Sequence, residues 1–133
     1  MKHHMPKALS IAALAVSLAA CASQPKAAAA PDSRDVLIAA PEHYRVLVEN
    51  AHVRIVECTL GPGEKDRMHT HPAGWFRVTR AGTMRVHFAT GKESVWHAAQ
   101  DESGWAEAEA AHTSENIGDA PMSFILVEVK SAA

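Results

Sequence analysis

Hydrophobic and polar residues alternate along several short stretches of this chain. Within residues 53–60, Val56, Cys58 and Leu60 recur at every second position, with polar residues between them. Residues 83–89 repeat the same alternation. Successive side chains of an extended strand point to opposite faces, so this period of two predicts strands with one buried face and one exposed face.

Turn-forming residues separate these stretches at short intervals. The Gly61-Pro62-Gly63 sequence ends the second stretch, because proline lacks the amide donor of a strand ladder and glycine accepts positive φ. The alanine-rich residues 105–111 have no helical apolar face, and we expect no helix there. The predicted strands cover residues 44–49, 53–60, 75–80, 83–89, 93–98, one or two within 105–116, and 122–129. This pattern indicates an all-β sandwich, jelly roll or small barrel.

The N-terminal part of the chain has a different character. Two lysines precede an uncharged run over residues 8–20. That run is shorter than the roughly 20 residues that a membrane-spanning helix needs, so we expect a signal peptide over residues 1–20. Residues 21–35 are rich in alanine and have no apolar period, which predicts a flexible linker before a single domain over residues 36–133.

Cys21 follows the expected signal peptide directly, in the sequence Leu18-Ala19-Ala20-Cys21. This sequence resembles the lipobox of bacterial lipoproteins. The resemblance implies cleavage before Cys21 and attachment of fatty acyl chains, palmitate among them, which would anchor the protein in a membrane. Ala22 in place of aspartate resembles the outer-membrane sorting pattern, which implies the periplasmic face of the outer membrane. The alternative is an ordinary secretory signal with an unmodified Cys21.

Charge and cysteine content exclude several classes of protein. The 133 residues include 13 Lys and Arg and 15 Asp and Glu, which leaves a formal net charge of −2. Because no basic cluster is present, nucleic acid is not an expected partner. The 2 cysteines, Cys21 and Cys58, exclude a disulfide scaffold and a multi-cysteine zinc site. Cys58 alternates in register with apolar neighbours, so we expect a buried thiol there and not a nucleophile.

Two histidines, His69 and His71, stand two positions apart in a stretch that begins at Gly63. On extended chain their side chains point to the same side, so both can bind one metal ion. The spacing from Gly63 through the histidines to Gly82 resembles the first motif of the cupin family. Trp75 occupies the position where that motif has glutamate.

A second stretch completes the resemblance to cupins. The family's second motif ends in histidine, three residues and asparagine, which His112 and Asn116 match. The flanking segments 46–54 and 115–121 resemble those of small single-domain cupins. The resemblance implies an RmlC-like fold, a double-stranded β-helix or jelly-roll barrel, preceded here by the signal peptide and the tether.

The cupin resemblance also implies a metal site formed by His69, His71 and His112. Imidazole ligands suit iron, zinc, nickel or copper, and manganese is a further candidate. The expected function is a membrane-anchored metal-binding protein that binds or oxidises a small, anionic molecule, as a dioxygenase-type cupin would. The alternative is a non-catalytic lipoprotein that binds or senses a small ligand and keeps these histidines only for packing.

Two further expectations depend on which face of residues 75–80 is buried. If Trp75 faces the interior, so does Arg77, which would then bind an anionic substrate as a fixed cation. If Phe76 and Val78 face the core, Arg77 faces water.

Exposed tryptophans on an outer cupin sheet are compatible with a homodimer. His87 and His97 are expected on the surface, without a metal role.

Overall fold

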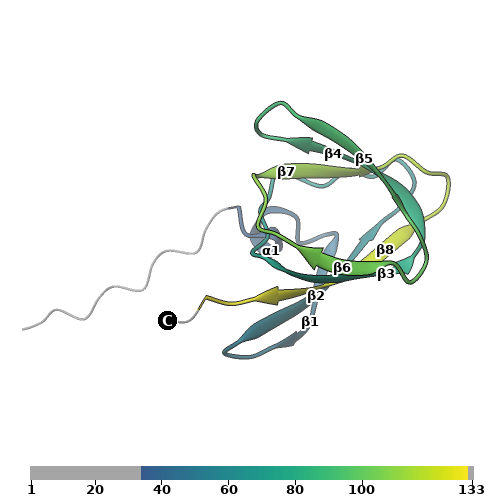
Figure 1. Ribbon diagram of the computed structural model, residues 1–133. Helices are drawn as coiled ribbons and strands as arrows, with labels where there is room; N and C mark the ends of the chain where they lie inside the picture. The colour runs from purple at the N-terminus through teal and green to yellow at the C-terminus, as the bar shows by residue number, and fades with distance from the viewer. Residues whose placement is uncertain (1–33, 132–133) are drawn as a thin grey trace, which may run out of the picture.

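The computed structural model describes residues 34–131, which form two antiparallel sheets facing each other (Figure 1). The expected signal peptide, Cys21 and the linker up to residue 33 lie outside the described residues. Within residues 34–131, no helix has the length and hydropathy needed to cross a membrane. The elements in chain order are α1 (Val36–Ala39), β1 (Tyr44–Glu49), β2 (Val53–Leu60), β3 (Gly74–Arg80), β4 (Gly82–Phe88), β5 (Glu93–Ala98), β6 (Ser103–Ala106), β7 (His112–Asn116) and β8 (Met122–Val129).

The strands form one sheet of five and one of three. The larger sheet has the order β1-β2-β8-β3-β6 and the smaller one the order β5-β4-β7. The longest ladder joins β2 to β8 over their full length, from Val53 opposite Val129 to Leu60 opposite Met122. The all-β jelly-roll prediction is confirmed.

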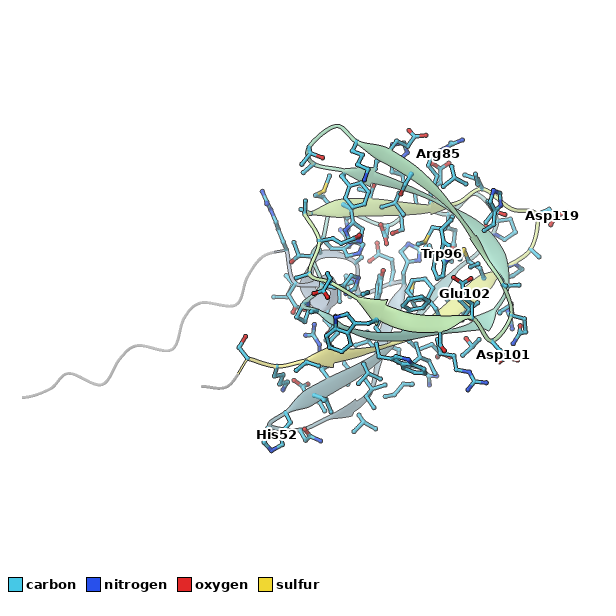
Figure 2. All side chains as sticks on the ribbon, in the orientation of Figure 1. His52, Arg85, Trp96, Asp101, Glu102 and Asp119 are labelled. Atoms are coloured by element: carbon cyan, nitrogen blue, oxygen red, sulfur yellow. The ribbon has the colours of Figure 1, made fainter. Side chains whose placement is uncertain are left out.

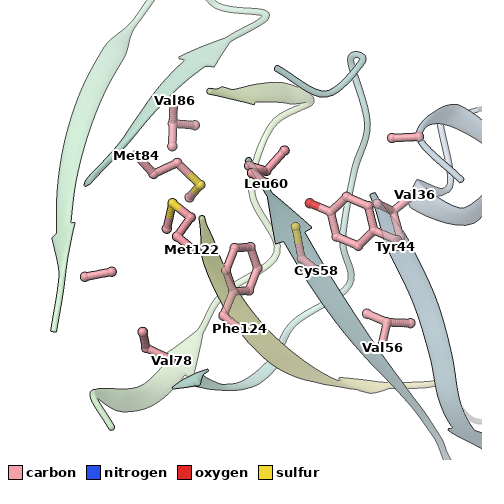
Figure 3. Packing of buried hydrophobic residues seen from close by; sticks show 12 residues of the cluster. Val36, Tyr44, Val56, Cys58, Leu60, Val78, Met84, Val86, Met122 and Phe124 are labelled. Atoms are coloured by element: carbon pink, nitrogen blue, oxygen red, sulfur yellow. The ribbon is translucent and has the colours of Figure 1, made fainter. Parts of the chain in front are cut away.

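The core lies between the two sheets. The inward residues of β2, Val56, Cys58 and Leu60, are fully buried, as their alternation predicts. They pack with Phe124 of β8 and with residues from the smaller sheet (Figure 3). Cys58 is buried as expected, and burial raises the pKa of its thiol.

The short helix α1 closes one end of the barrel and was not predicted. Asp35 caps it by accepting a hydrogen bond from the amide of Leu37 at 3.0 Å. Val36 is fully buried, and the carbonyl of Arg34 accepts a hydrogen bond of 2.8 Å from the amide of Thr70. Arg34 and Asp35, which we expected in the linker, therefore contact the barrel.

Asn116, the last residue of β7, joins two loops. Its buried side-chain amide donates to the carbonyls of Leu60 and Ala120, each at 2.9 Å, and its Oδ1 accepts from the amide of Gly118 at 2.9 Å. The asparagine of the second motif is thus a structural residue that holds the ends of β2 and β7 together.

Candidate metal centre

Backbone pairing brings the two histidine-bearing stretches together. The chain before β3 runs antiparallel to β7, with the amide of Asp66 donating to the carbonyl of Ser114 at 2.9 Å. Further along, His69 and His112 exchange two backbone hydrogen bonds of 2.9 Å each. Their Cα atoms are directly opposed across this pairing, so their side chains project from adjacent positions on the same side.

The three predicted histidines form one cluster. One ligand nitrogen of each of His69, His71 and His112 lies within 4.8 Å of the others. The ring centroid of His69 is 4.8 Å from that of His71 and 4.6 Å from that of His112. These nitrogens are somewhat farther apart than the separation of about 4 Å expected for ligands of one bound ion.

Each histidine is oriented by a hydrogen bond from its Nδ1. The Nδ1 atoms of His69 and His112 lie 2.7 Å and 3.0 Å from the carbonyl oxygens of Arg67 and Ala110. The Nδ1 of His71 lies 2.7 Å from Oε1 of Glu128. These oxygens only accept, so each Nδ1 carries the proton and each Nε2 keeps its lone pair for a ligand. Three neighbouring imidazoles, each with an Nε2 available as a ligand, suit a divalent metal.

Burial keeps two of these imidazoles neutral. It lowers the pKa of His69 from its usual 6.5 to about 3, assisted by the neighbouring charges of His71 and His112. Burial also lowers the pKa of His112. Metal ligation requires neutral imidazole, so neither residue needs to lose a proton at pH 7 before it binds a metal.

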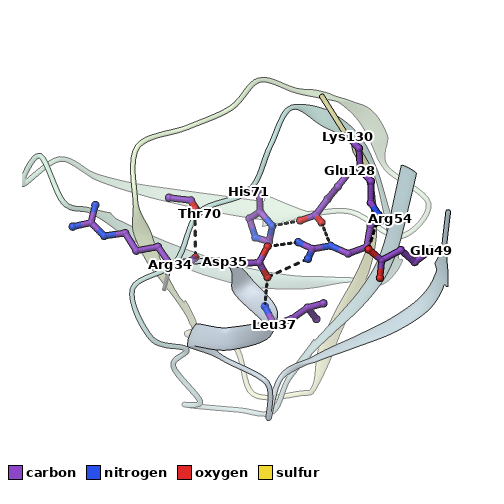
Figure 4. Close-up of polar contacts among 9 residues, drawn as sticks. All are labelled: Arg34, Asp35, Leu37, Glu49, Arg54, Thr70, His71, Glu128 and Lys130. Atoms are coloured by element: carbon purple, nitrogen blue, oxygen red, sulfur yellow. Dashed lines mark hydrogen bonds and ion pairs between the residues drawn. The ribbon is translucent and has the colours of Figure 1, made fainter. Parts of the chain in front are cut away.

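A buried carboxylate supports the site, and the motif analysis did not find it. Glu128 on β8 is 2% exposed, and its Oε2 accepts a hydrogen bond of 2.6 Å from Nε of Arg54 on β2. Arg54 in turn forms an ion pair of 2.9 Å with Asp35, so a continuous chain of contacts runs from α1 to His71 (Figure 4). The signal was available, because Arg54 and Glu128 are charged residues on the inward faces of β2 and β8, which are otherwise apolar.

Tyr44 and Asp66 lie beside the histidines. The Tyr44 hydroxyl is 3.2 Å from Oδ2 of Asp66 and 3.3 Å from Nε2 of His69. Asp66 also accepts a hydrogen bond of 2.5 Å from the amide of Ser114. Burial raises the pKa of Asp66 to about 6 and that of Tyr44 well above its usual range. The site therefore has protonatable groups within reach of the metal-binding nitrogens.

The structure places Arg77 outside the site. On β3 the side facing the interior of the barrel carries Gly74, Phe76 and Val78, so Trp75 and Arg77 lie on the outer face. Arg77 donates a hydrogen bond of 2.8 Å to Asp101. Of the two alternatives for this strand, the structure has the one in which Phe76 and Val78 face the core and Arg77 faces solvent, so Arg77 is not placed for the anion contact that the other alternative would allow. Trp75, at the motif's glutamate position, is 38% exposed.

His87 and His97 lie on the smaller sheet, away from the cluster. His87 forms an ion pair of 3.1 Å with Glu93 on the smaller sheet, and His97 is exposed on β5.

A cavity of about 260 Å³ between the two sheets adjoins the cluster, and His71 and His112 are among its lining residues. A small molecule in that cavity would lie against both of these histidines.

No protein-family profile and no curated protein matches this sequence. Several solved structures do match it. A cupin domain from Bordetella pertussis Tohama I superposes with a TM-score of 0.61 at 19% identity, over 66% of this chain and 92% of that one. An RmlC-like cupin from Methanocaldococcus jannaschii has a TM-score of 0.52 at 18% identity, over 65% and 79%. A double-stranded β-helix protein from Klebsiella pneumoniae has a TM-score of 0.52 at 23% identity, over 63% and 72%.

The fold is that of a cupin. At these levels of identity the likeness establishes architecture, and the chemistry has to come from the residues of this chain. In this cupin fold the two motif histidine segments meet as the sequence predicts, at one end of the barrel. The glutamate of the first motif has no counterpart there, and Glu128 contacts His71 from a different strand.

Proposed function

We propose that this cupin binds one divalent metal through His69, His71 and His112 and uses it to bind or oxidise a small molecule in the adjoining cavity. The observation that carries the proposal is the grouping of one ligand nitrogen from each histidine within 4.8 Å of the others, while each Nδ1–H is held by an oxygen and each Nε2 stays available to bind. A bound metal would supply Lewis acidity and, if it is iron, an open position for dioxygen.

The residues around the metal site would hold it and control its surroundings. Glu128 fixes the ring of His71 and makes that imidazole a stronger donor. Tyr44 and Asp66 offer a hydroxyl and a carboxyl group next to His69, where a proton can be held or passed. The apolar cavity limits access of water to this end of the barrel.

Metal analysis of the purified full-length chain tests the proposal. We expect one equivalent of metal per chain in the wild type and only traces in the double variant His71→Ala, His112→Ala. The matched control is His87→Ala, His97→Ala, which removes two histidines outside the cluster and should leave the metal content unchanged. If the wild type holds only traces after exposure to iron, zinc, nickel and manganese, the metal site is absent.

A non-catalytic role is the second candidate, and the outward position of Trp75 favours it. Without the motif glutamate, the described residues supply three ligands and no carboxylate ligand of that motif. A barrel of this kind could serve as a small-ligand receptor. Oxygen consumption by the metal-loaded protein, measured with thiols, diketones and amino acids, separates the two roles, because a receptor would consume no oxygen.

Membrane attachment through Cys21 is part of the proposal. The lipobox-like sequence supports it, together with a location on the periplasmic face of the outer membrane. In a bacterial host, radiolabelled palmitate should be incorporated into the wild-type chain and not into Cys21→Ala. The variant should move from the membrane fraction to the soluble fraction. Equal fractionation of the two proteins would contradict the anchor.

A further inference from the structure

The cavity beside the histidines has largely hydrophobic and aromatic walls. Side chains from both sheets contribute, and those that matter here are Phe76, Met84, Val86, Phe88, Trp96 and Phe124. The hydroxyl groups in the lining belong to Tyr44, Ser94 and Ser114. A ligand in this space would exchange water for apolar surface over most of its body, which favours an apolar ligand.

Three aromatic rings in this wall are arranged edge to face. The centroids of Phe76 and Trp96 are 5.4 Å apart with an interplanar angle of 86°, and those of Trp96 and Phe124 are 6.0 Å apart at 66°. Trp96 is fixed by a hydrogen bond of 3.1 Å from its Nε1 to Glu102, which also accepts from the amide of Ala99 (Figure 2). The wall is therefore preorganised to contact another ring.

The charged groups in the lining are unsuited to an anionic ligand. The lining residues that the structure describes include no lysine and no arginine, and their carboxylates are Glu107, Glu109 and Glu128. Glu128 is already paired with Arg54 and His71. A carboxylate or phosphate placed away from the histidines would lose its hydration and find no cation in return.

We propose that the cavity selects a compact ligand with an uncharged aromatic ring, oriented with a single hydroxyl or carbonyl group toward His71 and His112. A cavity of about 150 Å³ lined by Leu, Ile and Phe binds benzene. The 260 Å³ present here therefore accommodates one ring with small substituents. The role of the polar group rests on the proposed metal site, whereas the preference for the ring does not.

Binding of simple probes to the metal-free full-length chain tests the preference. Phenol, cyclohexanol, benzoate and glycerol 3-phosphate separate ring character from charge. We expect phenol to bind saturably and raise the midpoint of thermal unfolding. Cyclohexanol should bind several-fold more weakly, and the two anions should not bind. Equal affinity for phenol and benzoate, or no binding of phenol at millimolar concentration, would overturn the proposal.

The indole N–H signals in a two-dimensional NMR spectrum locate the bound ring. The signal of Trp96, assigned with Trp96→Phe, should shift with phenol concentration, and that of Trp105 on the outer face should stay in place. Phe76→Leu should weaken phenol binding roughly three- to tenfold through loss of the edge-to-face contact. The matched control Trp105→Leu should leave it unchanged. A shift confined to Trp105 would place the ligand elsewhere and overturn the proposal.

Failure of this inference is distinguishable from failure of the metal site. If the metal-free chain binds phenol but the metal analysis finds no bound metal, the preference of the cavity stands and the proposed function does not. Stoichiometric metal with no phenol binding would retain the metal centre and refute the preference. If Phe76→Leu fails to fold, the comparison of the four probes on the wild-type chain still decides.

Discussion

The carboxylate of Glu128 has two hydrogen-bond partners, and each partner bonds a different oxygen. One carboxylate oxygen accepts from Nδ1 of His71 and the other accepts from Arg54. The carboxylate is therefore oriented from both sides, and the ring of His71 is oriented by it. Histidines that bind metals generally donate a hydrogen bond to a carboxylate or carbonyl from the ring nitrogen that does not bind the metal.

Glu128→Gln should weaken metal binding about 10- to 100-fold, the usual effect of losing such a partner. Glutamine can still accept a hydrogen bond from His71, but it has no charge to strengthen the imidazole as a donor or to balance Arg54. A competition titration with a metal-sensitive chelator measures the change. The control Glu57→Gln alters a carboxylate on the opposite face of the same sheet, and equal losses in both variants would contradict a specific role for Glu128.

Acid should destabilise the metal-free protein. Below pH 6.5 the unfolded histidines bind protons, whereas folded His69 stays neutral down to a pH of about 3, so the unfolded state binds more protons. His112, whose pKa is also lowered, acts in the same direction. Asp66 acts oppositely between about pH 6 and its usual 3.8, because its pKa is raised on folding. Because two groups act in one direction and one acts in the other, we expect the free energy of unfolding to fall by an amount on the order of 1 kcal/mol for each unit that the pH is lowered.

Urea unfolding in the presence of a chelator, at pH values between 7 and 5, measures this slope. His69→Gln should flatten it, since glutamine has no proton to gain. His52→Gln should not, because His52 is exposed in the turn before β2. A free energy of unfolding that stays level or rises as the pH falls in the wild type would contradict the assignment.

Some site residues could be predicted from sequence and others could not. His69, His71 and His112 were found because fixed spacings carry them. The side of the strand that carries Arg77 stayed open, because two registers of one strand give opposite faces and only the packing of Phe76 decides between them. Glu128 was missed because motif spacing ignores isolated charges within apolar strands.

Among the elements, β7 and the chain that pairs with it determine the site. This pairing is held at one end by His69 and His112 and at the other by Asn116, whose side chain bonds the loops on both sides. Alternation predicted the bounds of β1, β2, β5 and β8 to the residue. It could not predict α1, because four residues carry too little periodicity and the helix depends on burial of Val36 and capping by Asp35.

Asn116→Ala should lower the free energy of unfolding by about 2 to 3 kcal/mol. The substitution leaves the carbonyls of Leu60 and Ala120 and the amide of Gly118 without their partner. Urea denaturation measures the loss. Asn50→Ala is the control, because the side chain of Asn50 also bonds the backbone, accepting from the amides of His52 and Val53, but lies exposed in a turn, and its loss should cost about 1 kcal/mol or less. Equal losses would contradict the buried role of Asn116.

For the molecule as a whole, the outer face of the larger sheet is the surface of most interest. Strand register places one row of apolar residues across all five strands: Val48, Ile55, Val127, Trp75 and Trp105. Trp105 is 56% exposed and Val48 is 50% exposed. A continuous exposed apolar row is typical of a protein interface.

We expect a second copy of the chain to cover this row. Sedimentation should then give twice the chain mass of 14.3 kDa for the wild type. Trp105→Arg should shift the protein to monomer, since it places a charge in the interface. Val95→Arg changes an exposed valine on the other sheet and should leave the dimer intact. A monomeric wild type would contradict the expected homodimer.

The first described residues also have a practical consequence. Arg34 bonds Thr70, the residue between two of the histidines, and Asp35 holds the arginine that orients Glu128. Any shortened form for crystallisation or binding assays should therefore begin before residue 34. A version trimmed to the first strand would retain His69, His71, His112 and both sheets, yet its metal affinity would describe a damaged site rather than the natural one.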